Sequence, residues 1–282
     1  MRRIARVLRG WRESTGEQSG AIARRAGWSA AKQSRLETGG QTITPADVMT
    51  LALILEVTED ERRAVFNAAL TAQEKGWWEE LATGALTDDA FDYVELESAA
   101  TGLTTFKIDL VHGLFQTPEY AAALVRAFVP QADEDTTRRR VAARVRRQDR
   151  LVGDRAIEAE VVLAEGALHL RIGGPKVMRA QLNRLLELGE LPNVHVRVLP
   201  SSAGAHPTMG VGYSILTFGG AESDESDESD VVYIELPHKG IYEEGPAAVD
   251  PYRLRFAGVR EIALAEKESA ALIAKIARTM KA

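Results

Sequence analysis

The chain has 282 residues, too many for one small module, and its apolar fraction of 45% is enough to build a sizeable core. It contains no cysteine, which excludes disulfides and thiolate metal sites and fits a reducing compartment. The basic N-terminus is not followed by an apolar signal core, and no stretch has the length of a membrane span. These features predict a soluble cytoplasmic protein that has no membrane partner.

The formal net charge of −6 is unevenly distributed along the chain. Residues 1–40 carry a net charge of +6, and the remaining residues carry −12. A basic end on an acidic body is typical of a protein that binds a polyanion. A solvated helix surface would produce the same pattern, so charge alone leaves both interpretations open.

Residues 1–73 have the pattern of five short helices. Ile4, Val7, Leu8 and Trp11 recur at the spacing of one helical face, and Gly16 ends that helix. A second helix is predicted at residues 18–26, and a third begins at an N-cap, Ser29, and runs to Glu37. Thr44-Pro45-Ala46-Asp47 and Thr58-Glu59-Asp60-Glu61 are N-terminal capping signatures, which open a fourth and a fifth helix.

Residues 74–88 are interpreted as a linker, and residues 89–282 as a larger domain with both helices and strands. Helices are predicted at 90–110, after Thr117, and at 133–151, 175–188, 250–259 and 267–280. Strands are predicted at 157–163, 167–172, 194–199, 212–218 and 231–236. The first two strands are expected to pair around a turn at Glu165-Gly166.

Residues 18–37 meet the requirements of a helix-turn-helix: a bracing helix, a tight turn, and a second helix whose exposed face can enter the major groove. Gly27 can adopt the positive φ that such a turn often needs, and Trp28 and Leu36 can anchor the unit to a core. A helical bundle that contacts proteins is the alternative. The expected fold class is therefore α+β, with a five-helix helix-turn-helix domain followed by a larger mixed α/β domain.

Residues 16–39, including Ala26-Gly27, Trp28-Ser29 and Ser34-Arg35-Leu36-Glu37, resemble the phage-repressor (XRE) type of helix-turn-helix. The resemblance implies that the start of the second helix grips phosphate and that the third helix reads base edges. The implied DNA-binding residues are Gln18, Ser19, Ser29, Ala30, Ala31, Lys32, Ser34 and Arg35. Two positions depart from the family, which often has glutamine at Ser19 and usually buries an aliphatic residue at Gln33. A buried Gln33 amide needs a hydrogen-bond partner.

The chemistry of these residues agrees with the resemblance. Arg35 can contact guanine O6 and N7 in a bidentate way, although a salt bridge to a neighbouring acid is the alternative. Ala30 and Ala31 offer methyl groups to thymine, and Lys32 suits a phosphate. Single domains of this kind bind weakly, and two-fold dimers are the common solution, so we expect a homodimer on a double-stranded DNA operator.

Residues 77–282 resemble the C-terminal domain of antitoxin-like XRE regulators of actinobacteria, the WhiJ type. The blocks that carry this resemblance include Trp77-Trp78, Glu95-Leu96-Glu97, Gly113-Leu114-Phe115-Gln116-Thr117-Pro118, Arg147-Gln148, Gly173-Gly174-Pro175 and Val231-Val232-Tyr233. His112 stands where the family usually has proline, and Phe115 where it usually has leucine. The resemblance implies a domain that senses a ligand or docks a small protein encoded nearby. Core and turn roles are the alternative for any single block.

No catalytic motif is evident. The five histidines have no metal spacing, and there is no nucleophile elbow, phosphate-binding glycine loop or dinucleotide fingerprint. Glu158 and Glu160 share one strand face, which is usually solvated. We therefore predict a protein that is not an enzyme and has no cofactor and no metal. The acidic segment 222–230 is interpreted as a solvated insertion; a competing idea is that it repels DNA or competes with it.

The leading hypothesis is a dimeric, sequence-specific transcriptional regulator whose C-terminal domain receives a signal from a small-molecule ligand or a small protein. The first alternative is an antitoxin-like protein that neutralises a partner protein and regulates its own operon. The second alternative is an enzyme that carries a DNA-binding domain.

Overall fold

The computed structural model describes residues 2–71, 88–219, 230–237 and 239–281, and its chain separates into two compact units, Met1–Glu79 and Glu80–Ala282. The first unit is all-helical and the second contains a sheet covered by helices, which confirms the predicted fold class. Predicted features within residues 72–87 and 220–229, including Trp77-Trp78 and most of the acidic segment, lie outside the described residues.

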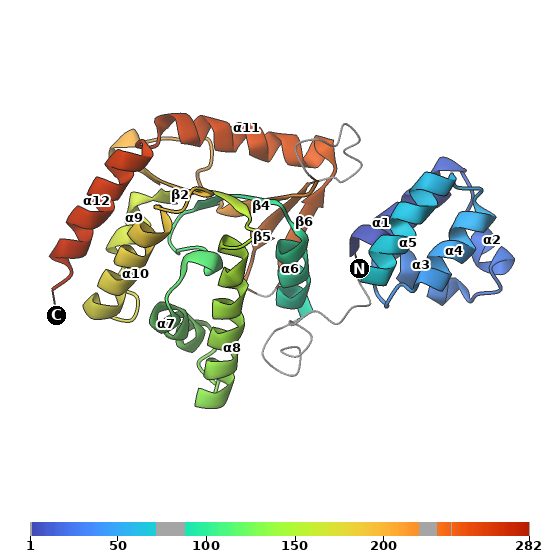
Figure 1. Ribbon diagram of the computed structural model, residues 1–282, viewed down its shortest axis with the longest axis horizontal. Coiled ribbons are helices and arrows are strands. Elements are labelled where there is room, and N and C mark those ends of the chain that lie inside the picture. Colours follow the sequence, from blue (N-terminus) through green and yellow to red (C-terminus); the bar gives the residue numbers. More distant parts are fainter. Residues whose placement is uncertain (1, 72–87, 220–229, 238, 282) are drawn as a thin grey trace. The chain divides into compact units, whose positions relative to one another are not determined.

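The N-terminal domain has the five predicted helices (Figure 1): α1 (Arg2–Ser14), α2 (Ser19–Arg25), α3 (Ala30–Thr38), α4 (Pro45–Ile54) and α5 (Glu59–Thr71). The capping box predicted for α4 is present, because the Thr44 side chain accepts from the Asp47 N–H and the Asp47 side chain accepts from the Thr44 N–H. One apolar core joins these helices, with Leu8, Ile22 and Leu36 completely buried. The helical spacing of apolar residues therefore gave the right elements in this domain.

The C-terminal domain is built on a six-stranded sheet in the order β3-β2-β1-β4-β5-β6. Strands β1, β2 and β3 are parallel, whereas β4, β5 and β6 each run antiparallel to the strand before them in that order. Phe106 in β1 is aligned with Val162 in β2 and with Tyr213 in β4. The strand bounds are β1 (Gly102–Lys107), β2 (Glu158–Ala164), β3 (Val194–Leu199), β4 (Tyr213–Thr217), β5 (Val231–Glu235) and β6 (Gly240–Glu244).

Helices cover both faces of this sheet and bury two separate apolar layers (Figure 1). One layer contains side chains of α6, α7, α10 and α12, and the other contains side chains of α11. The alternation of side chains along β1 sends Leu103 into the first layer and Phe106 into the second. The helix bounds are α6 (Asp88–Ala99), α7 (Pro118–Phe128), α8 (Glu134–Arg147), α9 (Glu165–His169), α10 (Pro175–Leu188), α11 (Pro246–Ile262) and α12 (Glu266–Thr279).

Two sequence predictions about the second domain were wrong, and one strand was missed. The helix expected at 90–110 ends at Ala99, and residues 102–107 form β1 in the middle of the sheet. Residues 167–172 are not a strand, because Glu165–His169 is the short helix α9 and β2 pairs in parallel with β1 and β3 instead. Strand β6 was not predicted. The pairings of β2 with β1 and with β3 were missed because parallel strands join segments that are distant in sequence, so no local turn marks them.

Candidate DNA interface

The turn between α2 and α3 has the backbone that a helix-turn-helix needs. Gly27 has a φ of +71°, a value that glycine adopts without steric cost and that was predicted for this turn. The Trp28 N–H donates to the Ala23 carbonyl at 2.8 Å, which closes the turn. The Ser29 hydroxyl then caps α3 by accepting from the Lys32 N–H at 3.1 Å. Helix α3 therefore begins at a fixed position relative to α2.

One face of α3 is exposed, and the opposite face is buried in the domain. Ala30, Ala31, Ser34 and Arg35 are exposed. By contrast, Leu36 is completely buried, and so is Gln33. The Arg35 Nε donates to the Gln41 amide oxygen at 3.0 Å, and among the described residues Arg35 forms no salt bridge to an acid. The predicted base-contacting side chains thus share one solvent-facing surface.

The residues expected to grip phosphate differ in their surroundings. Gln18 is the N-cap of α2, but its exposed side chain forms no capping hydrogen bond. Ser19 is the first residue of that helix. Lys32 is already engaged, because its ammonium lies 2.7 Å from the Asp47 carboxylate and 4.2 Å from the centre of the Trp28 ring. Lys32 therefore joins α3 to α4 in this structure, and its phosphate contact stays a prediction.

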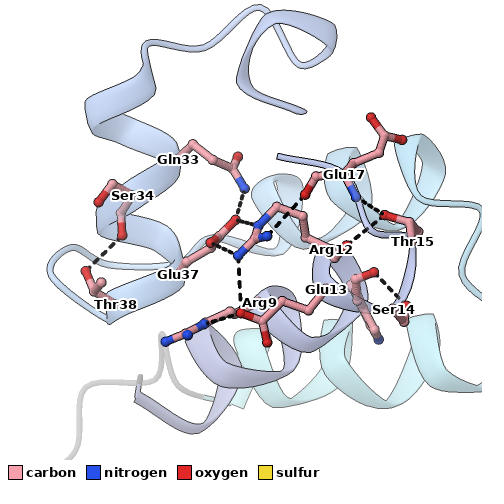
Figure 2. Close-up of polar contacts among 11 residues, drawn as sticks. Arg9, Arg12, Glu13, Ser14, Thr15, Glu17, Gln33, Ser34, Glu37 and Thr38 are labelled. Carbon is pink, nitrogen blue, oxygen red and sulfur yellow. Dashed lines mark hydrogen bonds and ion pairs between the residues drawn. The ribbon is translucent and has the colours of Figure 1, made fainter. Parts of the chain in front are cut away.

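A polar network braces the buried side of α3 (Figure 2). The Arg12 side chain of α1 contacts the Glu37 carboxylate twice, at 2.7 and 2.9 Å, and the carbonyl of Glu17 at 3.1 Å. Hydrogen bonding to Glu37 raises the pKa of Arg12 and outweighs the effect of burial. Gln33 donates to the same carboxylate at 2.6 Å, so its amide nitrogen has a partner. Its amide oxygen is buried and accepts no hydrogen bond from the described residues.

The sequence did not reveal these two bracing pairs, Arg12–Glu37 and Lys32–Asp47. Their members are 25 and 15 positions apart on different helices, where no helical or strand spacing connects them. Gln33 was the one signal available, since a polar residue at an expected core position needs a buried partner. Such pairs help to fix the position of a recognition helix while leaving its exposed face unoccupied.

Outside this interface, the described part of the chain contains no group of three or more His, Cys, Asp or Glu side chains arranged to hold a metal ion. Within that same part, no helix is both long and apolar enough to cross a bilayer.

The fold and the exposed face of α3 define a helix-turn-helix protein with a second, mixed α/β domain. A family model described as "Helix-turn-helix domain" matches residues 3–65, which indicates DNA binding. A second model, described as "Domain of unknown function (DUF5753)", matches residues 91–275, more than half of the chain, and the chain therefore belongs to this family. No curated protein and no solved structure matches the chain.

Proposed function

We propose that this protein is a sequence-specific transcriptional regulator of the XRE type that binds double-stranded operator DNA as a homodimer. The observation that supports the proposal best is the exposed face of α3, where Ala30, Ala31, Ser34 and Arg35 lie on a helix capped and braced from behind. A helix held in this way can enter the major groove without rearranging.

Arg35 is the residue on which specificity should depend most. An arginine that contacts guanine O6 and N7 contributes discrimination that a methyl group cannot replace. We expect Arg35→Ala to lose about 1–3 kcal/mol of specific binding, measured by titration of a labelled operator first identified by footprinting. The expected loss on non-specific DNA is much smaller, because phosphate contacts dominate there.

Arg63→Ala is a matched control, because Arg63 is an exposed arginine on α5 that pairs only with Glu59 of the same helix among the described residues. This variant should bind the operator as the wild type does. Equal operator affinity for Arg35→Ala and Arg63→Ala would refute the assigned role of Arg35. Light scattering tests the homodimer separately, because it measures the molecular mass in solution. A monomeric mass would contradict the homodimer.

For the C-terminal domain we propose a sensing or docking role in place of catalysis. A second candidate function is an antitoxin-like protein that binds a small protein encoded nearby and regulates its own operon. An open groove of about 940 Å³ between α7 and α8, lined by Ala122, Ala123, Val141, Ala142 and Val145 among others, favours protein docking. Co-expression with the small protein encoded nearby distinguishes the regulator from the antitoxin-like protein. Only the antitoxin-like function requires a stoichiometric complex of the two proteins.

A further inference from the structure

The loop that follows α3 returns the chain to the exposed face of that helix. Gly39, the C-cap of α3, has a left-handed backbone with a φ of +71°. The N–H groups of Gly39 and Gly40 both donate to the backbone carbonyl of Arg35. The chain is fixed again at Ile43, which is completely buried in the domain core. Gln41 lies between these two fixed points, so the loop places its side chain beside that of Arg35.

Arg35 and Gln41 each form one side-chain hydrogen bond within the described part of the chain, and they form it with each other. The Arg35 Nε donates to the Gln41 Oε1 at 3.0 Å. The orientation of the amide follows from chemistry, because every guanidinium nitrogen is a donor and only the amide oxygen can accept. The stem of Arg35 also runs past Gly40, where a Cβ atom would lie 3.5 Å from the Arg35 Cγ. The loop thus contacts both the stem and the guanidinium of an arginine that is otherwise exposed.

This contact leaves a defined part of the guanidinium for a ligand. With Nε occupied, the two terminal nitrogens of Arg35, Nη1 and Nη2, have no partner among the described residues. Two parallel donors match O6 and N7 of guanine, which are both acceptors in the major groove, whereas adenine presents one acceptor and one donor there. We infer that Gln41 is a positioning residue, which holds Arg35 in the orientation that presents these two donors to a guanine of the operator.

Positioning of this kind increases affinity through entropy. A free arginine side chain loses rotamer freedom when it binds a base, whereas a side chain that is already held loses less. Non-specific DNA does not need this orientation, because phosphate contacts dominate there. The inference rests on the proposed DNA-reading role of Arg35 and adds to it a residue that lies outside α3.

The first test uses the full chain without DNA. Nitrogen relaxation of the Arg35 Nε–H in NMR reports side-chain motion on the picosecond to nanosecond timescale. Gln41→Met removes the acceptor with little change in length, so the Arg35 Nε–H should be rigid in the wild type and flexible in this variant. Gln41→Glu keeps an acceptor and should restore the rigid signal, and Gln131→Met, at an exposed glutamine of the C-terminal domain, should leave it unchanged. Equal flexibility in the wild type and Gln41→Met would overturn the inference.

The second test measures operator affinity in a double-mutant cycle. Gln41→Met should weaken operator binding about 2- to 10-fold, the scale of ordering one long side chain, and should change neither non-specific binding nor the unfolding temperature. In the Arg35→Ala background the same replacement should have no further effect, because Gln41 acts through Arg35. Gln41→Glu should keep the wild-type ratio of operator to non-specific affinity, although its negative charge weakens both.

The outcomes of this cycle separate the inference from the proposed function. If Arg35→Ala weakens operator binding and Gln41→Met does not, Arg35 reads DNA without help from Gln41, and only the inference is wrong. If Gln41→Met weakens binding equally with and without the Arg35 side chain, Gln41 contacts DNA itself or supports the fold, and the inference is again wrong. If Arg35→Ala binds the operator as tightly as the wild type does, the proposed role of Arg35 is wrong together with the inference.

Discussion

In the N-terminal domain two carboxylates, Glu37 and Asp47, each hold one cation from another helix. In the C-terminal domain the buried Glu97 carboxylate holds one cation, Arg147, through two hydrogen bonds of 2.7 Å. In the N-terminal pairs the cations keep some exposure, 14% for Arg12 and 33% for Lys32. In the second domain Arg147 is 11% exposed and Glu97 is 1% exposed, so this pair is the most deeply buried of the three. Breaking the C-terminal pair should therefore cost more folding free energy than breaking either N-terminal pair.

The largest effect should follow from breaking the Arg147–Glu97 pair. Arg147→Met leaves the Glu97 carboxylate, whose side chain is 1% exposed, without its bidentate partner. Removing one member of a buried pair costs about 3–5 kcal/mol of folding free energy. Urea unfolding of the full chain measures this loss, and hydrogen exchange should locate it at α6 and α8. A variant as stable as the wild type would show that the pair contributes little.

A double variant sharpens the same comparison. Replacing both partners, with Arg147→Met and Glu97→Leu, should recover most of the stability that the single variant loses, because no uncompensated charge remains. The exposed Arg138→Ala serves as the control on the same helix and should leave stability unchanged.

A smaller loss should follow from Arg12→Met in the N-terminal domain. The Glu37 carboxylate would keep its hydrogen bond from Gln33, and Arg12 is partly exposed, so the expected cost is about 1–3 kcal/mol. Hydrogen exchange of the full chain should show the loss in α1 and α3, and operator binding should weaken although Arg12 is not on the exposed face of α3. Arg9→Ala, which removes an exposed pair within α1, is the control and should change neither quantity. Unchanged protection of α3 would contradict the bracing role of Arg12.

The two domains also differ in how far the sequence could predict them. In the N-terminal domain, the helices follow from local signals such as the Ser29 cap, the Thr44–Asp47 capping box and Gly27. In the C-terminal domain, β1 is a six-residue strand that begins three residues after α6 ends, and the predicted helix at 90–110 ran on through it. Its Thr104-Thr105-Phe106 core, rich in β-branched and aromatic residues, was the available signal.

The candidate sites show the same difference. The exposed face of α3 lies within one continuous segment, so residues such as Ser34 and Arg35 could be named from the sequence. By contrast, the buried Arg147–Glu97 pair joins α8 to α6 across 50 positions of the chain. Only the folded sheet brings such residues together, because parallel connections join segments that are distant in sequence.

The smallest effect we predict concerns Lys32 and depends on pH. Burial by itself raises the pKa of Asp47, but hydrogen bonds from Lys32 and Thr44 outweigh it and lower the pKa overall. A carboxylate with a lowered pKa in the folded state stabilises the protein above its unfolded pKa of about 3.9. That contribution is lost as the pH falls through the folded-state value. Lys32→Met should therefore raise the pKa of Asp47, as NMR titration would show.

The accompanying loss of stability near pH 7 should be only roughly 0.5 kcal/mol, since the lysine remains about one-third exposed. The difference in unfolding free energy between Lys32→Met and the wild type should become smaller as Asp47 is protonated. The attraction between Asp47 and Lys32 then disappears in the wild type as well. Lys32→Arg retains the positive charge and is the matched control. If this difference in unfolding free energy instead stays constant from pH 7 into the acid range, the contact of Lys32 with the Trp28 ring, whose centre is 4.2 Å from the ammonium, accounts for the stabilisation. In that case charge pairing would not be what fixes α3 to α4.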